Sequence, residues 1–182
     1  MLDTTFARPI GDAGNAASWP FPVLIERVSG AFVEAVVTRR FDDVQPFVDA
    51  ARRLVQRGAC AITTTCGFLL RHQQRLQREL PVSVLTSTLT QFARLQAALA
   101  TQQSVAILTS DANALDSSVR NLAGIGINAL ATACLRQHPS IGLWLFECAN
   151  MAPYSAALSR VMGLPVFDAL TLGRELYAMV IS

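Results

Sequence analysis

The sequence predicts an α/β fold in which parallel sheets are covered by helices on both faces. Three observations support this prediction. Short runs of consecutive apolar residues alternate with longer segments of helical periodicity, a pattern typical of parallel strands joined by helices. Hydrophobic residues make up 52% of the 182 residues, which is enough to bury a sizeable core. No linker or low-complexity segment divides the chain, so we expect residues 1–182 to form one unit.

In the first half of the chain, three short apolar runs are predicted as strands, over residues 59–65, 82–85 and 104–109. Helices are expected before and between these strands, over residues 44–57, 68–79 and 88–100. The first of these helices has the clearest ends, because Asp42 and Asp43 stand at its start and Gly58 follows it. Pro81 stops the second helix.

The second half of the chain repeats this alternation. Strands are expected over residues 141–147 and 165–167, and helices over residues 128–137, 150–161 and 169–180. In folds of this class, ligands bind beyond the carboxyl ends of the strands. The residues that directly follow the predicted strands are therefore the first candidates for a functional site.

Two cysteines occupy equivalent places by this rule. Cys66 follows the strand of residues 59–65, Cys148 follows the strand of residues 141–147, and each stands directly before a helix. The start of a helix favours negative charge, so we expect a lowered thiol pKa at both positions. Two thiols facing one small ligand could remove a proton from a carbon atom and return one to its other face. Cys60 and Cys134 are expected to be core residues.

Composition excludes several classes of function. All 15 basic residues are Arg, so a Schiff-base or pyridoxal-phosphate lysine is impossible. A net charge of +2 makes nucleic acid an improbable partner, and the Cys and His spacings fit no metal site. No apolar run is long enough to span a membrane, and the first residues do not resemble a signal peptide. We therefore expect a cytoplasmic protein with free thiols, no cofactor and no membrane partner.

Several short segments, taken in order, carry a resemblance to a known family: Gly11–Asn15, Trp19–Pro22, Thr63–Leu69, Glu147–Tyr154 and Gly163–Asp168. They resemble the aspartate/glutamate racemase superfamily, whose members use two cysteines and no cofactor. The resemblance implies two pseudo-symmetric Rossmann-like lobes, residues 1–85 with the C-terminal helix and residues 86–165, with the active site in the cleft between them. The Cys66-Gly67 pair is more similar to hydantoin racemases and arylmalonate decarboxylases than to glutamate racemases.

The resemblance also implies roles for individual residues. Cys66 and Cys148 would be the two acid–base thiols. The substrate carboxylate would be held by Asn15, Thr64, Thr65 and Asn150. Asp12 falls near an acidic residue that often supports the first thiol, although it could also form an Asx turn. Independently of the resemblance, polar groups at expected strand ends and helix starts add three further substrate-binding candidates: Thr109, Ser110 and the backbone of Gly67.

The sequence thus predicts a cofactor-independent racemase or epimerase that acts on a small amino-acid-like carboxylate or hydantoin. Two alternatives stay open: a single-cysteine decarboxylase or isomerase on the same fold, and a catalytically degenerate protein that only binds a small molecule. Members of the family usually carry a few dozen more residues before the second cysteine, so a shortening is expected near residues 117–131. The resemblance also makes a homodimer an expectation.

Overall fold

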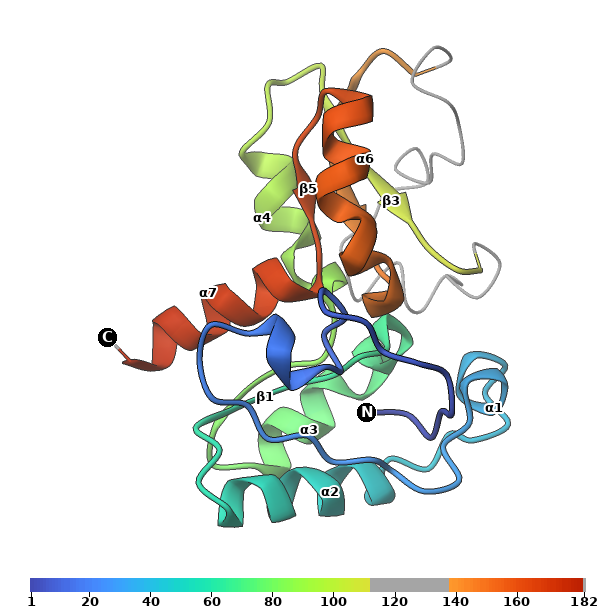
Figure 1. Ribbon diagram of the computed structural model, residues 1–182, viewed down its shortest axis with the longest axis vertical. Helices are drawn as coiled ribbons and strands as arrows, with labels where there is room; N and C mark the ends of the chain where they lie inside the picture. The colour runs from blue at the N-terminus through green and yellow to red at the C-terminus, as the bar shows by residue number, and fades with distance from the viewer. Residues whose placement is uncertain (112–137, 182) are drawn as a thin grey trace.

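The computed structural model describes residues 1–111 and 138–181, and it confirms an α/β fold with parallel sheets (Figure 1). In the first sheet, β1 (Ala61–Thr63) pairs with β2 (Ser83–Leu85). In the second sheet the strand order is β3 (Ser104–Leu108), β4 (Ile141–Phe146) and β5 (Val166–Phe167). Every one of these pairings is parallel, as the continuous apolar strands predict.

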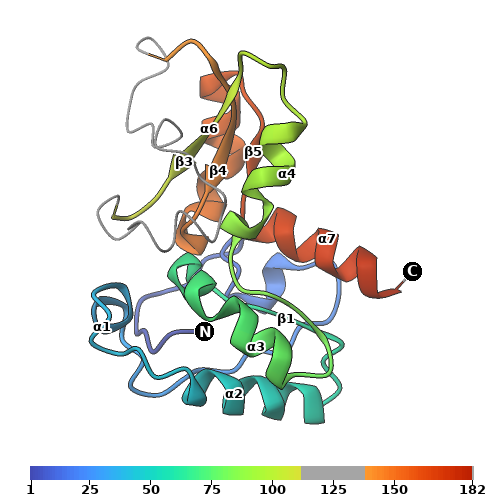
Figure 2. The same ribbon diagram turned by 180° about the vertical axis from the view of Figure 1, so that it is seen from behind.

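The α-helices of the described residues are α1 (Val33–Val37), α2 (Gln45–Gln56), α3 (Gln73–Glu79), α4 (Phe92–Ala97), α6 (Ser155–Met162) and α7 (Ala169–Ile181). Figures 1 and 2 show α2 and α3 beside the first sheet, and α4 and α6 beside the second. The last helix, α7, returns from β5 to pack against β1 and β2. The C-terminal helix therefore belongs structurally with the first sheet.

Three of the expected helices begin with 3₁₀ turns that the sequence did not reveal. These turns are η2 (Gly67–His72) before α3, η3 (Thr88–Gln91) before α4, and η5 (Ala149–Tyr154) before α6, while a further one, η1 (Ala16–Ser18), lies in the N-terminal loop. In η5 the cause is visible, because Pro153 lies inside it and has no N–H to donate. Both Cys66 and Cys148 immediately precede such a 3₁₀ turn.

The strands of the second sheet are buried on both faces. Val105, Ile107 and Leu145 belong to a large core that continues into α2, β1 and β2. On the opposite face, Trp144 and Phe146 belong to a second cluster that includes side chains of α6. The large core therefore spans both sheets and joins them through shared apolar packing.

The expectation that Cys60 is a core residue is wrong. Cys60 is exposed rather than buried, because β1 begins only at Ala61 and Cys60 lies in the loop before it. Cys134, the helix expected over residues 128–137 and the shortening expected near residues 117–131 lie outside the described residues. Within residues 1–111 and 138–181, no helix combines the length and apolarity needed to cross a membrane.

Candidate active site

A narrow cavity has both predicted thiols in its wall. It is lined by residues that follow β1, β3 and β4 and by the N-terminal segment, among them Thr4, Phe6, Arg8, Thr65, Cys66, Phe68, Ser110, Glu147, Cys148 and Asn150. About 40 Å³ of its space is open to the centres of water-sized molecules, which is room for about three waters, so only a very small ligand fits this conformation. The structure thus brings together residues that are 82 positions apart in the sequence at the carboxyl ends of strands in different sheets.

The first thiol, Cys66, is fixed through its neighbour Thr64. The Thr64 hydroxyl accepts the Cys66 N–H at 3.3 Å and donates to the carbonyl of Thr86 at 2.6 Å, just beyond the end of β2. Only 8% of Cys66 is exposed. Burial, aided by the negative charge of Glu147, raises the pKa of the Cys66 thiol to about 12, although the Phe68 N–H opposes this. The lowered thiol pKa predicted from the sequence is therefore wrong, because desolvation outweighs the short 3₁₀ turn.

The second thiol, Cys148, is half-buried beyond the end of β4. Burial raises its pKa too, and the charge of Glu147 acts in the same direction, while the N–H of Asn150 opposes both. Both thiols are therefore neutral at physiological pH in the free protein. A thiolate in this cavity needs a nearby group that takes its proton, or a bound cation that offsets its charge.

Glu147 is the residue that the sequence analysis missed. Its exposure is 3%, although it immediately follows the apolar strand β4. Its Oε2 accepts a hydrogen bond from the Thr109 hydroxyl at 2.9 Å, and the backbone N–H groups of Gly67 and Ser110 also donate to the carboxylate. Burial raises the pKa of Glu147 to about 7 against these three donors. A carboxylate that ends a wholly apolar strand beside a candidate thiol was the available signal.

Gly67 is required by this arrangement. A Cβ at position 67 would lie 2.8 Å from Cδ of Glu147 and would overlap Oε1. The backbone N–H of Gly67, predicted as a substrate-binding group, donates to the carboxylate of Glu147. Thr109, predicted for the same role, also donates to Glu147.

We expect Gly67→Ala to destabilise the protein by about 1–3 kcal/mol, which is typical of overpacking a filled site. The new methyl group must displace either the Glu147 carboxylate or the turn η2. Urea unfolding monitored by circular dichroism measures the loss. The double variant Gly67→Ala/Glu147→Ala is the control, because it removes the Cγ, Cδ and Oε1 atoms that the new methyl group would meet and should recover part of the stability. Equal stability of Gly67→Ala and wild type would contradict this packing.

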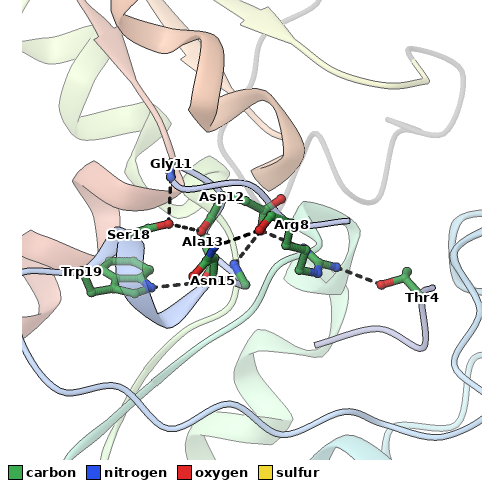
Figure 3. A network of polar contacts seen from close by, with 9 residues as sticks. Thr4, Arg8, Gly11, Asp12, Ala13, Asn15, Ser18 and Trp19 are labelled. Atoms are coloured by element: carbon green, nitrogen blue, oxygen red, sulfur yellow. Dashed lines mark hydrogen bonds and ion pairs between the residues drawn. The ribbon is translucent and has the colours of Figure 1, made fainter. Parts of the chain in front are cut away.

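A second charged group beside the cavity, Arg8, also escaped the sequence analysis (Figure 3). Its Nη1 lies 2.8 Å from Oδ1 of Asp12, and its Nη2 donates to the Thr4 hydroxyl at 3.0 Å. The side chain of Arg8 is 10% exposed. Its buried Nε has no hydrogen-bond partner among the described residues. Arg8 is therefore a fixed cation in the wall of the cavity.

In the loop around Arg8, two of the predicted site residues make contacts that hold the loop together. Asp12 forms the ion pair with Arg8 and also accepts the Gly14 N–H at 2.6 Å, which is the Asx turn considered above. Asn15 caps η1 by accepting the Ala17 N–H at 2.9 Å, and it donates to the Arg8 carbonyl at 2.8 Å (Figure 3). Of the predicted substrate-binding side chains, Thr65, Ser110 and Asn150 line the cavity, whereas Asp12, Asn15, Thr64 and Thr109 support it from outside.

A larger cavity of about 390 Å³ shares Thr65 with the smaller one and is also lined by Thr64, but it contains neither Cys66 nor Cys148. It is bordered by the free edge of β1, the extended segment of residues 22–26 and α7, with Trp19, Phe21 and Tyr177 in its wall. Its wall is mainly apolar and holds none of the paired thiols or the buried carboxylate described above. The smaller cavity is therefore the better candidate active site despite its size.

Comparison with known proteins agrees with an enzyme of this fold. No family model matches the chain. A dimethylsulfoniopropionate lyase of Durusdinium sp. clade D is 25% identical over a gapped alignment of 205 positions, which covers 88% of this chain and 66% of the lyase. Dimethylsulfoniopropionate lyase 3 of Emiliania huxleyi (strain CCMP1516) is 25% identical over a gapped alignment of 225 positions, which covers 100% of this chain and 58% of the lyase. The chain thus spans about three fifths of the length of these curated relatives.

Solved structures give the same picture at the level of fold. The crystal structure of arylmalonate decarboxylase superposes with a TM-score of 0.56 at 14% identity, covering 88% of this chain and 82% of the decarboxylase. Unliganded arylmalonate decarboxylase gives a TM-score of 0.54 at 15% identity, covering 86% of this chain and 80% of the decarboxylase. The chain therefore has a fold similar to that of arylmalonate decarboxylase, one of the enzymes that its motifs resemble, and its relatives in sequence and structure are enzymes.

Proposed function

We propose that this protein is a cofactor-independent lyase that removes a proton from the carbon next to a carboxylate and expels a leaving group from the adjacent carbon. One observation carries the proposal: Cys66 and Cys148 line one small cavity together with the buried cation Arg8. A group that binds a carboxylate and a group that accepts a proton are the minimum for this chemistry. The 25% identity to dimethylsulfoniopropionate lyases supports a lyase of this kind.

The charges around the cavity favour a zwitterionic substrate such as dimethylsulfoniopropionate. Its carboxylate would pair with the guanidinium of Arg8, which lines the cavity. Its sulfonium would lie toward the thiols and Glu147, where a positive charge lowers the pKa of a neighbouring thiol. Phe6 and Phe68 also line the cavity, and aromatic faces attract cations. The substrate itself would then supply the charge that the buried thiols need in order to ionise.

In this mechanism Cys148 is the base and Cys66 is a neutral donor. Cys148 is less buried than Cys66, so desolvation penalises its thiolate less. The Cys148 thiolate takes the proton from the α-carbon, and the electrons of that C–H bond form the double bond. The bond between the β-carbon and sulfur breaks, its electron pair leaves on dimethyl sulfide, and acrylate remains. The Cys66 thiol, neutral because of its high pKa, donates to the charge that develops on the carboxylate.

A racemase or epimerase, the leading expectation from the sequence, is the second candidate. The specific observation in its favour is that two thiols, rather than one, line the cavity. With a substrate that has no leaving group at the β-carbon, the α-carbanion would take a proton back, from Cys66 instead of Cys148. The same carbanion also arises by loss of carbon dioxide, the activity for which the structural neighbours are named.

The test is to supply each substrate class to the purified protein in deuterated water. Dimethyl sulfide measured by gas chromatography, together with acrylate in the proton NMR spectrum, would support the lyase. Deuterium at the α-carbon of amino acids or 5-substituted hydantoins, with inversion and no elimination, would instead support the racemase. Release of carbon dioxide from an arylmalonate would support a decarboxylase. Folded protein that turns over only these last substrates, or none of the panel, would overturn the lyase proposal.

For Arg8 we expect a loss of substrate binding. Removing Arg8 alone would leave the Asp12 carboxylate buried without its partner, so the variant is Arg8→Gln/Asp12→Asn. Because a charge-assisted hydrogen bond contributes about 1.5–3 kcal/mol, KM for dimethylsulfoniopropionate should rise about 10- to 100-fold. Steady-state kinetics measures this change, and Arg27→Gln, which removes an exposed arginine, is the matched control. An unchanged KM would remove Arg8 from the carboxylate site.

A further inference from the structure

We propose that Glu147 is a positioning residue that ties the two cysteine-bearing segments together and that, through its charge, controls how readily each thiol ionises. The consequence for catalysis rests on the proposed function. The effect of Glu147 on thiol ionisation is present in the protein without a ligand, so it can be measured without any substrate.

The geometry around Glu147 connects three separate parts of the chain. Glu147 itself stands between β4 and Cys148. Its carboxylate accepts from the Thr109 hydroxyl and the Ser110 N–H, which directly follow β3. It also accepts from the Gly67 N–H, one residue after Cys66. One side chain therefore links the ends of two strands of the second sheet to the turn that follows β1 in the first sheet. Moving the carboxylate would move both thiols relative to each other.

The charge of Glu147 has no cation to balance it among the described residues. Two arginines act on the thiols: Arg71 on Cys66 and Arg8 on Cys148. Each is within ion-pair distance of another carboxylate, Arg71 of Asp42 at 3.3 Å and Arg8 of Asp12 at 2.8 Å. No described Lys, Arg or His side chain forms an ion pair with Glu147, which is held by neutral donors alone. Its negative charge therefore acts on both cysteines with little compensation.

A carboxylate and a thiolate in this site oppose each other. Like charges at close range in a buried site disfavour double ionisation, so the cluster of Glu147, Cys66 and Cys148 holds one negative charge much more readily than two. Burial also raises the pKa of Glu147 to about 7, so its charge is lost within the physiological range. Protonation of Glu147 is then the event that permits a thiol to ionise. In the proposed reaction, a proton held on Glu147 leaves the single charge for the catalytic thiolate.

The experiment measures thiol ionisation directly, as the rate of alkylation by iodoacetamide from pH 6 to pH 10. A Cys60→Ser background removes the exposed thiol that shares a tryptic peptide, residues 58–71, with Cys66. Cys148 is the sole cysteine in the tryptic peptide of residues 137–160. Mass spectrometry of these two peptides therefore reports each thiol separately. Two variants change the carboxyl group: Glu147→Gln removes its charge, and Glu147→Asp keeps the charge but shortens the side chain. Glu175→Gln, which removes an exposed carboxylate paired with Arg94, is the matched control.

We expect Glu147→Gln to be alkylated about tenfold faster than wild type at pH 8, at both Cys66 and Cys148, because removing a like charge lowers a pKa by about one unit or more. Glu147→Asp should keep the slow alkylation but lose turnover, because the charge remains while the tether is too short. Unchanged pH profiles in folded Glu147→Gln, or the same acceleration in Glu175→Gln, would overturn the proposal.

Thr109→Val provides an independent test in case Glu147→Gln does not fold. Thr109→Val removes a hydrogen bond that lowers the pKa of Glu147, so the carboxyl group should stay protonated to higher pH and alkylation at pH 8 should be faster than in wild type. Slower or equal alkylation in Thr109→Val would contradict control by charge. The alkylation rates are measured without substrate. A protein that fails to release dimethyl sulfide would therefore refute the proposed function without affecting this result.

Discussion

Cys148→Ser should reduce the release of dimethyl sulfide at least about 10³-fold, and Cys66→Ser should reduce it about 10²- to 10³-fold. The site already raises the pKa of the Cys66 thiol to about 12 and also raises that of Cys148. A serine hydroxyl is a far weaker acid than a thiol, so in the same desolvated position it cannot form the anion that removes a proton. Cys66→Ser is the milder change, because a neutral hydroxyl can still donate a hydrogen bond.

Headspace gas chromatography measures these losses, and α-deuterium exchange in the same samples separates the two roles. Cys148→Ser should lose exchange together with elimination, because it cannot form the carbanion. Cys60→Ser is the control, since Cys60 is an exposed thiol outside the cavity and its substitution should leave the rate unchanged. Full activity in Cys66→Ser would exclude a two-thiol mechanism and favour the single-cysteine chemistry considered from the sequence.

The strands and the position of the two thiols could be predicted because they depend on local patterns. The apolar runs around Ile62 and Leu145 lie in β1 and β4, and the rule that ligands bind at carboxyl ends of strands selected Cys66 and Cys148. The predicted helix ends were less accurate, because a 3₁₀ turn and an α-helical turn share nearly the same apolar spacing. Only the proline in η5 marks its irregular start in the sequence.

The remainder of the site could not be predicted because it depends on burial and long-range contacts. Arg8 lies in an irregular loop, and nothing in its sequence neighbourhood shows that its side chain is nine-tenths buried in the wall of the cavity that both thiols line. Glu147 depends on donors supplied from residues 67, 109 and 110. The predicted direction of the thiol pKa shift was wrong for the same reason. A helix start is visible in the sequence, but the desolvation that outweighs it at Cys66 is not.

The largest effect on stability should come from the pH dependence that Glu147 gives to folding. The pKa of this carboxyl is raised from its ordinary 4.5 to about 7 by burial. Between these values the folded protein keeps a proton that the unfolded chain has lost, so the contribution of Glu147 to stability is greatest below pH 4.5 and falls as pH rises toward 7. A shift of this size corresponds to a loss of roughly 3 kcal/mol across the window.

Two other buried groups titrate nearby with the opposite sign. Burial lowers the pKa of the Met1 amino group to about 6, and it also lowers the pKa of His72. The unfolded chain binds more protons at these sites, so their contributions to stability rise with pH between their folded and unfolded pKa values. In wild type these contributions partly cancel that of Glu147, so urea unfolding of wild type alone would show only a weak dependence of stability on pH. The difference between wild type and Glu147→Gln isolates the carboxyl, because Met1 and His72 titrate equally in both.

We expect the free energy of unfolding of Glu147→Gln, relative to that of wild type, to rise by roughly 3 kcal/mol between pH 4.5 and pH 8. The same difference should not change with pH for the control Glu175→Gln, which alters an exposed carboxylate. An unchanged difference across this range would mean that Glu147 titrates normally in the folded protein, and its proposed control of the thiols near neutral pH would fail with it. A difference of the expected size would show that the fold maintains a buried, unbalanced carboxylate at a cost in stability. Because the same carboxylate holds the segments of Cys66 and Cys148 in place, that cost has a structural reason in the site itself.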